Sequence, residues 1–450
     1  MTRPAGELAG KMLAILAFVM VATFMTLIMT KRLSALVALI LVPTLFAIGA
    51  GFTQGLGPMM LKGVIELAPT GVMLLFAILY FGLMIDTGLF DPLIRLIVRL
   101  VHGDPMRILI GTVALALIVS LDGDGTTTYM ITVSALLPLY RHMKMDLRMM
   151  TCLLIMSSAV MNIAPWGGPT VRAATALHVD PRELFVGLIP AMATTALWTF
   201  FVAWIFGKRE RRRLAALAPT QENEQTTPQE VIDEEIGGDT SMRRPRLFWF
   251  NLALTATLLV LLVIGSLPLV VLFMLAFAIA AMVNYPRLQQ QKERISAHAG
   301  NALGTVSLIF GAGIFTGILS GTGMVDAMAG SVTSIIPPAL GPYMAPITAL
   351  VSIPFTVLIS NDAFYFGMLP VLGQTGMQYG LTPMELARAS LIGQQIHLLS
   401  PLVASTYLLV GLAGVELGDH QRFTFRWALG SCAVFMITCL LLGVFPLYKS

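Results

Sequence analysis

Charged side chains are scarce in this sequence. Asp, Glu, Lys and Arg make up 12% of its 450 residues, whereas about 25% is usual for a soluble domain. Hydrophobic residues make up 56%, and the mean hydropathy is +0.82. So few polar side chains cannot cover a water-soluble globule of this size. The composition therefore excludes that class and predicts a polytopic protein of the lipid bilayer.

Cysteine is nearly absent. Cys152, Cys432 and Cys439 all lie in apolar stretches, and no Cys-x-x-Cys pair occurs. This pattern excludes a disulfide framework and does not indicate a zinc site. We interpret the three cysteines as small packing residues.

The excess of positive charge is also small, with a net charge of +4. Lys and Arg lie at the ends of apolar runs, where they set topology, so no nucleic-acid partner is expected. The stretch 208–246 holds 16 of the 52 charged residues and is rich in Gln, Glu, Thr and Pro. We interpret 207–246 as a cytoplasmic linker between two halves of the chain.

Long apolar runs are abundant, and each must be helical in lipid because every backbone polar group needs a partner within the segment. The run 12–30 is long enough to span and has no clear cleavage site before Lys31, so a retained helix is expected rather than a signal peptide. Four other stretches are interrupted by Gly, Pro or charge, and such breaks need a lining of protein or water. The uninterrupted runs are 12–30, 33–53, 66–86, 184–206, 247–265, 267–284, 300–320 and 424–447; the interrupted ones are 106–141, 148–178, 343–378 and 385–414.

Four motifs recur in the same order at nearly the same offset. The first pair shares Gly, Thr, Gly and Asp at an offset of 235 residues. Such a series indicates two internal repeats, over 1–206 and 247–450. The matched motifs are 82–91 with 317–326, 120–124 with 360–362, 137–138 with 369–370 and 164–165 with 400–401.

Basic residues fall on one side of the membrane if 106–141 is a re-entrant hairpin, and the positive-inside rule makes that side the cytoplasm. Each half then has five spanning segments and one hairpin, and an odd count turns the second repeat upside down. The predicted fold is all-α, with about ten transmembrane helices and two re-entrant hairpins, a design of secondary transporters. The basic residues are Lys31, Arg32, Arg95, Arg99, Arg107, Arg141, Lys144, Arg148, 208–213, Arg287, Lys292 and Arg294.

The middle of the segment 106–141 combines carboxylates, glycines and hydroxyls. Charged groups deep in a bilayer are costly and are functional by default. Carboxylates suit a hard divalent cation, whereas the N-terminal end of the following helix suits an anion. A solvent-exposed loop whose Asp caps a helix is the alternative. The candidate binding residues are Asp122, Gly123, Asp124, Gly125, Thr126 and Thr127.

Ser360, Asn361 and Asp362 form the corresponding tip of the second half, between two apolar arms of 343–378. A helix N-cap at Asn361 or Asp362 accounts for this tip as well as a binding site does. The two roles are compatible, because a cap fixes the geometry of the tip.

Two prolines and two glycines interrupt 148–178, which cannot stay helical through them. Thr170 is expected to begin a new half-helix. The fork of Arg172 suits bidentate binding of a carboxylate, although an ion pair with Asp122 or Asp124 would also account for it. The candidate residues are Asn162, Trp166, Gly167, Gly168, Thr170 and Arg172.

The equivalent break within 385–414 contains His397, Ser400 and Ser405. His397 is the one histidine expected at membrane depth, where it would bind substrate or carry a proton. A structural, hydrogen-bonded histidine is an equally good interpretation.

Several of these motifs resemble the citrate–metal:proton symporter family, CitMHS. The likeness covers nearly the whole chain except the linker and is carried by 12–43, 121–128, 162–174 and 360–370. The resemblance implies a transporter of the bacterial plasma membrane with no prosthetic group. It would take up citrate with a divalent ion of the Mg or Ca class, coupled to protons.

This family looks related to the ion transporter superfamily, whose members are dimers with a scaffold domain and an elevator-type transport domain. Their hairpin tips carry Ser-Asn-Thr, and sodium sites rest on those tips. Here Asp362 replaces the Thr of the second tip, and Asp122-Gly-Asp124 replaces the first, which makes sodium coupling less expected. We assign Asp122, Asp124 and Asp362 to the metal or the coupling protons. Carboxylates are assigned to Arg172, Thr126, Ser360, Asn361 and the half-helix ends.

Other functions fit the sequence less well. An intramembrane aspartyl protease needs a second aspartate motif, and proteolysis leaves the Ser360 copy unexplained. A channel would show polar rings along an open path, whereas broken inverted repeats favour alternating access. A symporter of another di- or tricarboxylate, with sodium or proton coupling, is the main alternative.

Overall fold

The structure is a computed structural model that describes residues 3–92, 95–96, 104–123, 125–217, 242–335, 337–400 and 402–449. All regular secondary structure in these ranges is helical, as predicted. Seven of the described helices are long and apolar enough to cross a membrane, and five further apolar helices are shorter. Asp124 and most of the predicted linker, 218–241, lie outside the described residues.

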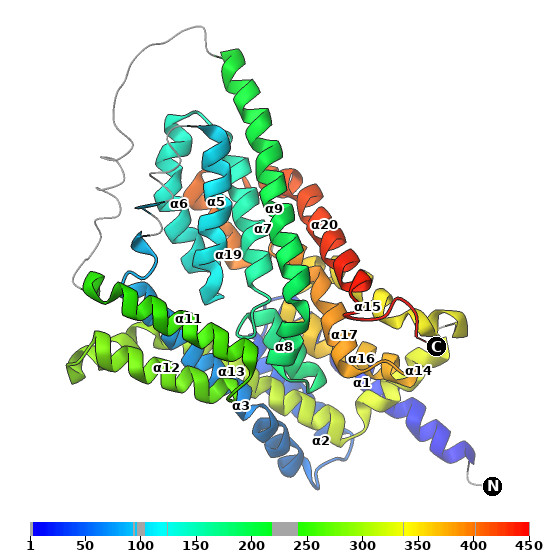
Figure 1. Cartoon of the computed structure of the whole chain (residues 1–450). Helices are drawn as coiled ribbons and strands as arrows, with labels where there is room; N and C mark the ends of the chain where they lie inside the picture. The colour runs from blue at the N-terminus through cyan, green and yellow to red at the C-terminus, as the bar shows by residue number, and fades with distance from the viewer. Residues whose placement is uncertain are drawn as a thin grey trace.

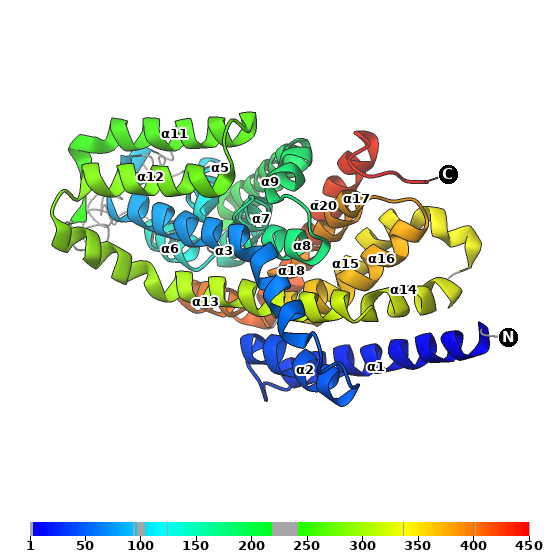
Figure 2. The same cartoon turned by 90° about the horizontal axis from the view of Figure 1, so that it is seen from below.

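One group of helices, the scaffold bundle, packs around α3 and α13 (Figures 1 and 2). In Figure 2, α11, α12, α3 and α13 lie in succession on one side of the molecule. Both α3 and α13 are longer than the apolar runs 66–86 and 300–320 that predicted them. The bundle comprises α1 (Arg3–Met29), α2 (Ala35–Gly49), α3 (Leu56–Asp86), α11 (Phe248–Ile264), α12 (Leu269–Asn284), α13 (Leu288–Gly321) and α14 (Met324–Ile335).

Glycines let the backbones of α3 and α13 touch. A Cβ atom added at Gly63 would lie 1.9 Å from the carbonyl oxygen of Gly313, and one at Gly317 would lie 2.4 Å from that of Met59. Small residues spaced four apart are what close helix packing in membranes requires. The crossing therefore fixes the scaffold bundle at its centre.

Gly63→Ala is expected to destabilise the scaffold bundle, because α3 and α13 must separate to admit the methyl group. We expect a melting temperature several degrees lower for the purified protein, as for other overpacked helix contacts costing about 1–3 kcal/mol. Gly57→Ala is the control, because it lies on the same helix with no atom within 4 Å. Equal melting temperatures for the two variants would contradict this account of the crossing.

The remaining helices form a second group, the hairpin bundle, in which α5, α6, α7 and α9 run side by side (Figure 1). Two helix pairs, α5 with α6 and α15 with α16, occupy the segments predicted as hairpins. The bundle comprises α5 (Pro105–Val119), η1 (Ser120–Asp122), α6 (Gly125–His142), α7 (Leu147–Met161), α8 (Gly168–Leu177), α9 (Pro181–Leu217), η4 (Pro338–Tyr343), α15 (Met344–Leu358), the π-helix η5 (Ala363–Met368), α16 (Leu369–Gln378), α17 (Pro383–Ser390), η6 (Leu391–Gly393), α18 (Gln394–His397), α19 (Ala404–Ala413) and α20 (Leu417–Leu441).

The two halves of the chain interlock within the hairpin bundle. The half-helix α8, from the first half, packs against η5 and α16 of the second half. In turn, α19 from the second half packs against α6 of the first. Each hairpin tip therefore lies near broken helices from both halves.

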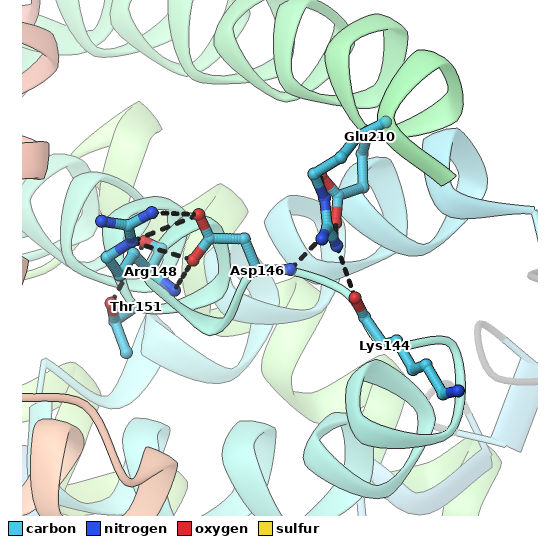
Figure 3. A network of polar contacts seen from close by, with 6 residues as sticks. Lys144, Asp146, Arg148, Thr151 and Glu210 are labelled. Atoms are coloured by element: carbon cyan, nitrogen blue, oxygen red, sulfur yellow. Dashed lines mark hydrogen bonds and ion pairs between the residues drawn. The ribbon is translucent and has the colours of Figure 1, made fainter. Parts of the chain in front are cut away.

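A polar network ties the α6–α7 loop to the end of α9 (Figure 3). Glu210 is fully buried; its carboxylate accepts a hydrogen bond of 2.9 Å from the Asp146 backbone N–H and pairs with Arg213 at 2.5 Å. Asp146 in turn pairs with Arg148 at 2.8 Å. Burial raises the pKa of the Asp146 carboxyl, but the hydrogen bonds from Arg148 outweigh it and leave that pKa below its usual value. The loop is thus held by charged contacts on the side that carries the basic residues.

Candidate functional site

A cavity of about 480 Å³ lies where the hairpin tips meet the two helix breaks. One wall comes from the hairpin bundle and the other from the scaffold helices α3 and α13. Ten of the residues singled out in the sequence line this cavity, although they come from segments up to 282 residues apart. They are Gly123, Gly125, Thr127, Asn162, Trp166, Gly168, Arg172, Asn361, His397 and Ser405.

The first tip is anchored to the first break. Gly123 adopts a left-handed conformation with φ 78°, which ends η1 and turns the chain towards α6. The Ser120 hydroxyl lies 3.1 Å from that of Ser158, and the Trp166 ring N–H donates to the Leu121 carbonyl at 2.8 Å. The Asp122 side chain and all of Asp124 lie outside the described part of the chain, so their metal-binding roles stay predictions. Thr126 lies in the first turn of α6 and does not line the cavity.

The first broken helix stops at Met161 and resumes at Gly168. The predicted restart at Thr170 is two residues late, because Pro169 suits the first turn, where its missing N–H costs nothing. Thr170 is buried and donates its hydroxyl hydrogen to the Ile163 carbonyl at 2.8 Å, so it braces the break rather than lining the cavity. Gly167 is not among the lining residues; a Cβ atom there would come within 2.0 Å of the Asn162 carbonyl oxygen.

An ion pair joins the first broken helix to the second tip. The Arg172 Nε donates to Asp362 Oδ1 at 2.7 Å, and the two side chains are only 17% and 15% exposed. The described partner of Arg172 is therefore Asp362. The side chains of Asp122 and Asp124 lie outside the described part of the chain, so a pairing of Arg172 with either one stays a prediction. Arg172 also lines the cavity beside Gly168, where a Cβ atom would lie 2.7 Å from its Nη1. Its guanidinium can hold Asp362 on one edge and offer N–H groups to a second carboxylate.

The second tip has a cap and a side-chain anchor. The Ser360 hydroxyl accepts from the Ala363 backbone N–H at 3.2 Å, so Ser360, rather than Asn361 or Asp362, takes the capping role. The amides of Asn361 and Gln394 exchange hydrogen bonds of 3.1 and 3.5 Å. Gln394 also donates to the Tyr365 hydroxyl at 2.9 Å. This anchor parallels the Ser120–Ser158 contact of the first tip.

His397 is buried at the second break, and its Nδ1 lies 2.5 Å from the Thr356 carbonyl oxygen. A carbonyl only accepts, so Nδ1 carries a hydrogen and Nε2 is left for other partners. Ser405 lines the cavity close to Gly125, at 3.4 Å from the position of an added Cβ atom. Ser400 is buried and accepts from the Leu402 backbone N–H at 3.2 Å, away from the cavity lining.

The scaffold wall was not predicted from the sequence. Its lining includes Phe81 and Gly82 on α3 and His298 and Thr305 on α13. His397 is thus not the one histidine of this cavity, because His298 lines it as well; the expectation about membrane depth stays a prediction. His298 lies just before the apolar run that begins at 300. Because it follows a polar segment of the sequence, hydropathy does not assign it to the membrane helix.

A preformed metal site is not evident in the described part of the chain. No group of three or more His, Cys, Asp or Glu side chains gathers there in a way that could hold a metal ion. Two of the three predicted metal ligands, the side chains of Asp122 and Asp124, lie outside the described part of the chain, whereas Asp362 pairs with Arg172.

Known proteins resemble this chain over most of its length. A sequence profile described as citrate transporter (CitMHS) matches residues 9–393. A Bacillus subtilis (strain 168) protein named citrate transporter is 56% identical over 436 residues, covering 96% of this chain and 99% of that protein. A second protein of that strain, named Mg(2+)/citrate complex secondary transporter, is 50% identical over 434 residues with the same two coverages.

Two solved structures share the fold. The Alcanivorax borkumensis YdaH transporter aligns with a TM-score of 0.54 and 14% identity, over 89% of this chain and 90% of that one. Neisseria gonorrhoeae MtrF, described as an antimetabolite efflux pump, aligns with a TM-score of 0.60 and 13% identity, over 87% and 84%. At these identities the likeness concerns the fold alone. The profile and the Bacillus subtilis relatives establish that this chain belongs to the citrate transporter family, as a multi-pass plasma-membrane transporter and not an enzyme.

Proposed function

We propose that this protein takes up citrate as a one-to-one complex with a divalent metal ion, coupled to protons, by an elevator-type alternating-access movement of the hairpin bundle. The observation that carries the proposal is the cavity at which both tips and both breaks meet around the Arg172–Asp362 pair. The name of the Mg(2+)/citrate relative supports the metal complex as cargo. By its resemblance to the superfamily, the proposal includes a homodimer.

Charge favours the complex over free citrate. Citrate at neutral pH is close to trivalent, whereas its one-to-one complex with a divalent cation has a net charge near −1. The cost of removing an ion from water rises steeply with its charge. A cavity within a membrane protein therefore accepts the complex more readily.

The Arg172–Asp362 pair suits a cargo that carries both signs of charge. Each of these charges neutralises the other at 2.7 Å. A metal–citrate complex brings a cation for Asp362 and carboxylates for Arg172, so it can take over both partners without leaving a buried charge unpaired. Asp122 and Asp124 would add ligands for the metal or sites for the coupling protons. Thr126, Ser360 and Asn361 would receive the remaining carboxylate oxygens.

The position of the cavity supports an inward-facing state. Its scaffold wall uses the half of α3 that ends at Asp86 and the half of α13 that follows Arg294. The basic residues of 243–246 lie next to the end of α3, where Arg243 pairs with Asp91 and the Arg244 backbone N–H donates to the Thr87 carbonyl. By the positive-inside rule, this side faces the cytoplasm. A second cavity of about 580 Å³ lies between the hairpin bundle and the opposite ends of α3 and α13. Two cavities at opposite ends of the same helices suit alternating access.

The test is a panel of metals and substrates with protein reconstituted into liposomes. Labelled citrate uptake is expected to fall more than about tenfold when a chelator removes divalent ions, because the trivalent anion is far costlier to desolvate. An inward proton gradient should drive accumulation, and a sodium gradient alone should not. Malate and tricarballylate serve as competitors. Undiminished uptake in chelator would rule out the metal complex, and sodium-driven uptake would favour the alternative symporter.

A further inference from the structure

The cavity's scaffold wall holds a charged cluster that the proposed site does not use. His298 Nε2 lies 2.8 Å from Asp86 Oδ2, and Arg294 Nη1 lies 3.1 Å from the same oxygen. The three side chains are 20%, 18% and 16% exposed. Asp86 ends α3, while Arg294 and His298 lie one turn apart on α13. The cluster thus links the two central scaffold helices at the rim of the cavity.

The ring of His298 is held in one orientation. An ionised carboxylate only accepts hydrogen bonds, so Nε2 carries the hydrogen that Asp86 binds. Arg294 fixes Asp86 from the other side. The ring packs on α3 at Gly82, where a Cβ atom would lie 2.5 Å from Nδ1 and 2.7 Å from Cε1 and Cγ. Gly82 and His298 both line the cavity. Because Nε2 binds Asp86, Nδ1 is the ring nitrogen left for another partner.

In this orientation, the protonation state of His298 decides whether Nδ1 can bind a carboxylate. In the neutral ring, Nδ1 has only a lone pair, which repels a carboxylate oxygen. In the charged ring, Nδ1 carries a hydrogen and donates a charge-assisted hydrogen bond. The contact therefore depends on the protonation state of this ring.

We propose that His298, positioned by Asp86 and Arg294, is the scaffold's contact for a cargo carboxylate, formed when the ring is protonated and released when it is neutral. The inference rests on the proposed transport of metal–citrate and deepens it. An alkaline cytoplasm would weaken the contact and speed release. Since the contact belongs to the scaffold wall of this cavity, it would act on the cytoplasmic face and not on the outer one.

Neighbouring charges do not obscure the effect. Titratable or charged groups near this cluster or across the cavity are Asp86, Arg294, Tyr285, Arg244, Arg172 and His397. His298→Gln preserves an N–H for Asp86 but cannot become charged, so it isolates the switch from the packing.

The experiment compares the half-saturation constant for Mg–citrate in everted and right-side-out membrane vesicles at pH 6 and pH 8. In everted vesicles at pH 6, His298→Gln is expected to raise this constant about tenfold, as loss of one charge-assisted hydrogen bond would. At pH 8 the two proteins should differ less than about twofold. Comparison at equal pH cancels the titration of citrate itself. Asp86→Asn should weaken the pH 6 contact in the same direction, because the charged ring loses its partner.

His178→Gln is the matched control. His178 also faces a carboxylate, Glu66 at 3.6 Å, but it lines the opposite cavity. It is expected to leave the everted-vesicle constant unchanged. A His298→Gln change that is equal on both faces or at both pH values, or no change at all, would overturn the proposal. Failure of the wild-type protein to take up Mg–citrate would instead refute the proposed function, so the two failures are distinguishable.

Discussion

Arg172→Gln is expected to reduce Mg–citrate uptake more than about 100-fold, because truncating one partner of a buried ion pair costs about 3–5 kcal/mol. The change leaves Asp362 only 15% exposed without its counterion, and it removes the guanidinium beside Gly168 from the cavity. Arg172→Lys keeps the charge but loses the fork, so an intermediate loss of about tenfold is expected. Initial uptake rates in liposomes, at equal amounts of reconstituted protein, measure both effects.

A second arginine–aspartate pair, Arg148 with Asp146, is the control that separates the effect of losing Arg172 from the effect of losing any paired arginine. Arg148 pairs with Asp146 at 2.8 Å but is 46% exposed and lies in the loop network of Figure 3, away from the cavity. Exposed pairs contribute about 0–1 kcal/mol, so Arg148→Gln should change uptake only slightly. The double variant Arg172→Gln with Asp362→Asn removes both charges. Recovery of transport in that variant would mean that the pair has a purely structural role.

The fold was predictable because lipid penalises unpaired backbone groups. An apolar segment interrupted by proline or glycine can adopt few backbone conformations in lipid. The sequence therefore reveals the two helix breaks, at 162–167 and 398–403, and the two hairpin turns, at 120–125 and 359–362. Because the motifs recur in the same order, the sequence also assigns one hairpin turn and one break to each half of the chain. The convergence of ten candidate residues on one cavity follows from that grouping.

The pairings were not predictable. Arg172 and Asp362 are 190 residues apart, and nothing local distinguishes Asp362 from the aspartates of the first tip as the partner. Ser158 and Gln394 anchor the two tips, yet in the sequence they are ordinary polar residues within helices. Which side chain faces which depends on the packing of α8 against η5, and that contact is set by the whole bundle.

The scaffold wall was missed for a different reason. Apolar runs mark the part of a helix that lies in lipid, whereas α13 begins at Leu288, twelve residues before the predicted run. The extra turns are polar and carry Arg294 and His298. Amphipathic ends of long helices lie against protein and water, so hydropathy alone does not reveal them.

Gly167→Ala is expected to lower Mg–citrate uptake about 100-fold, as misplacing a binding group by about 1 Å does. The backbone at Gly167 has φ −67° and ψ 140°, which alanine adopts easily, so the cause is contact and not backbone strain. The added Cβ atom would lie 2.0 Å from the Asn162 carbonyl and 2.9 Å from that of Ala164. Backbone oxygens cannot swing aside, so the start of α8 must shift. Arg172, one turn along α8, would shift with it.

Gly411→Ala is the control for this prediction, because it lies on the half-helix α19 of the same bundle with no atom within 4 Å. Alanine is the better helix former there, so a slight gain in stability and unchanged uptake are expected. The dissociation constant for Mg–citrate and the melting temperature should be measured for both variants. A weakened affinity with little change in melting temperature would indicate that the break positions Arg172. Wild-type affinity in Gly167→Ala would mean that the cavity does not depend on the geometry of the break.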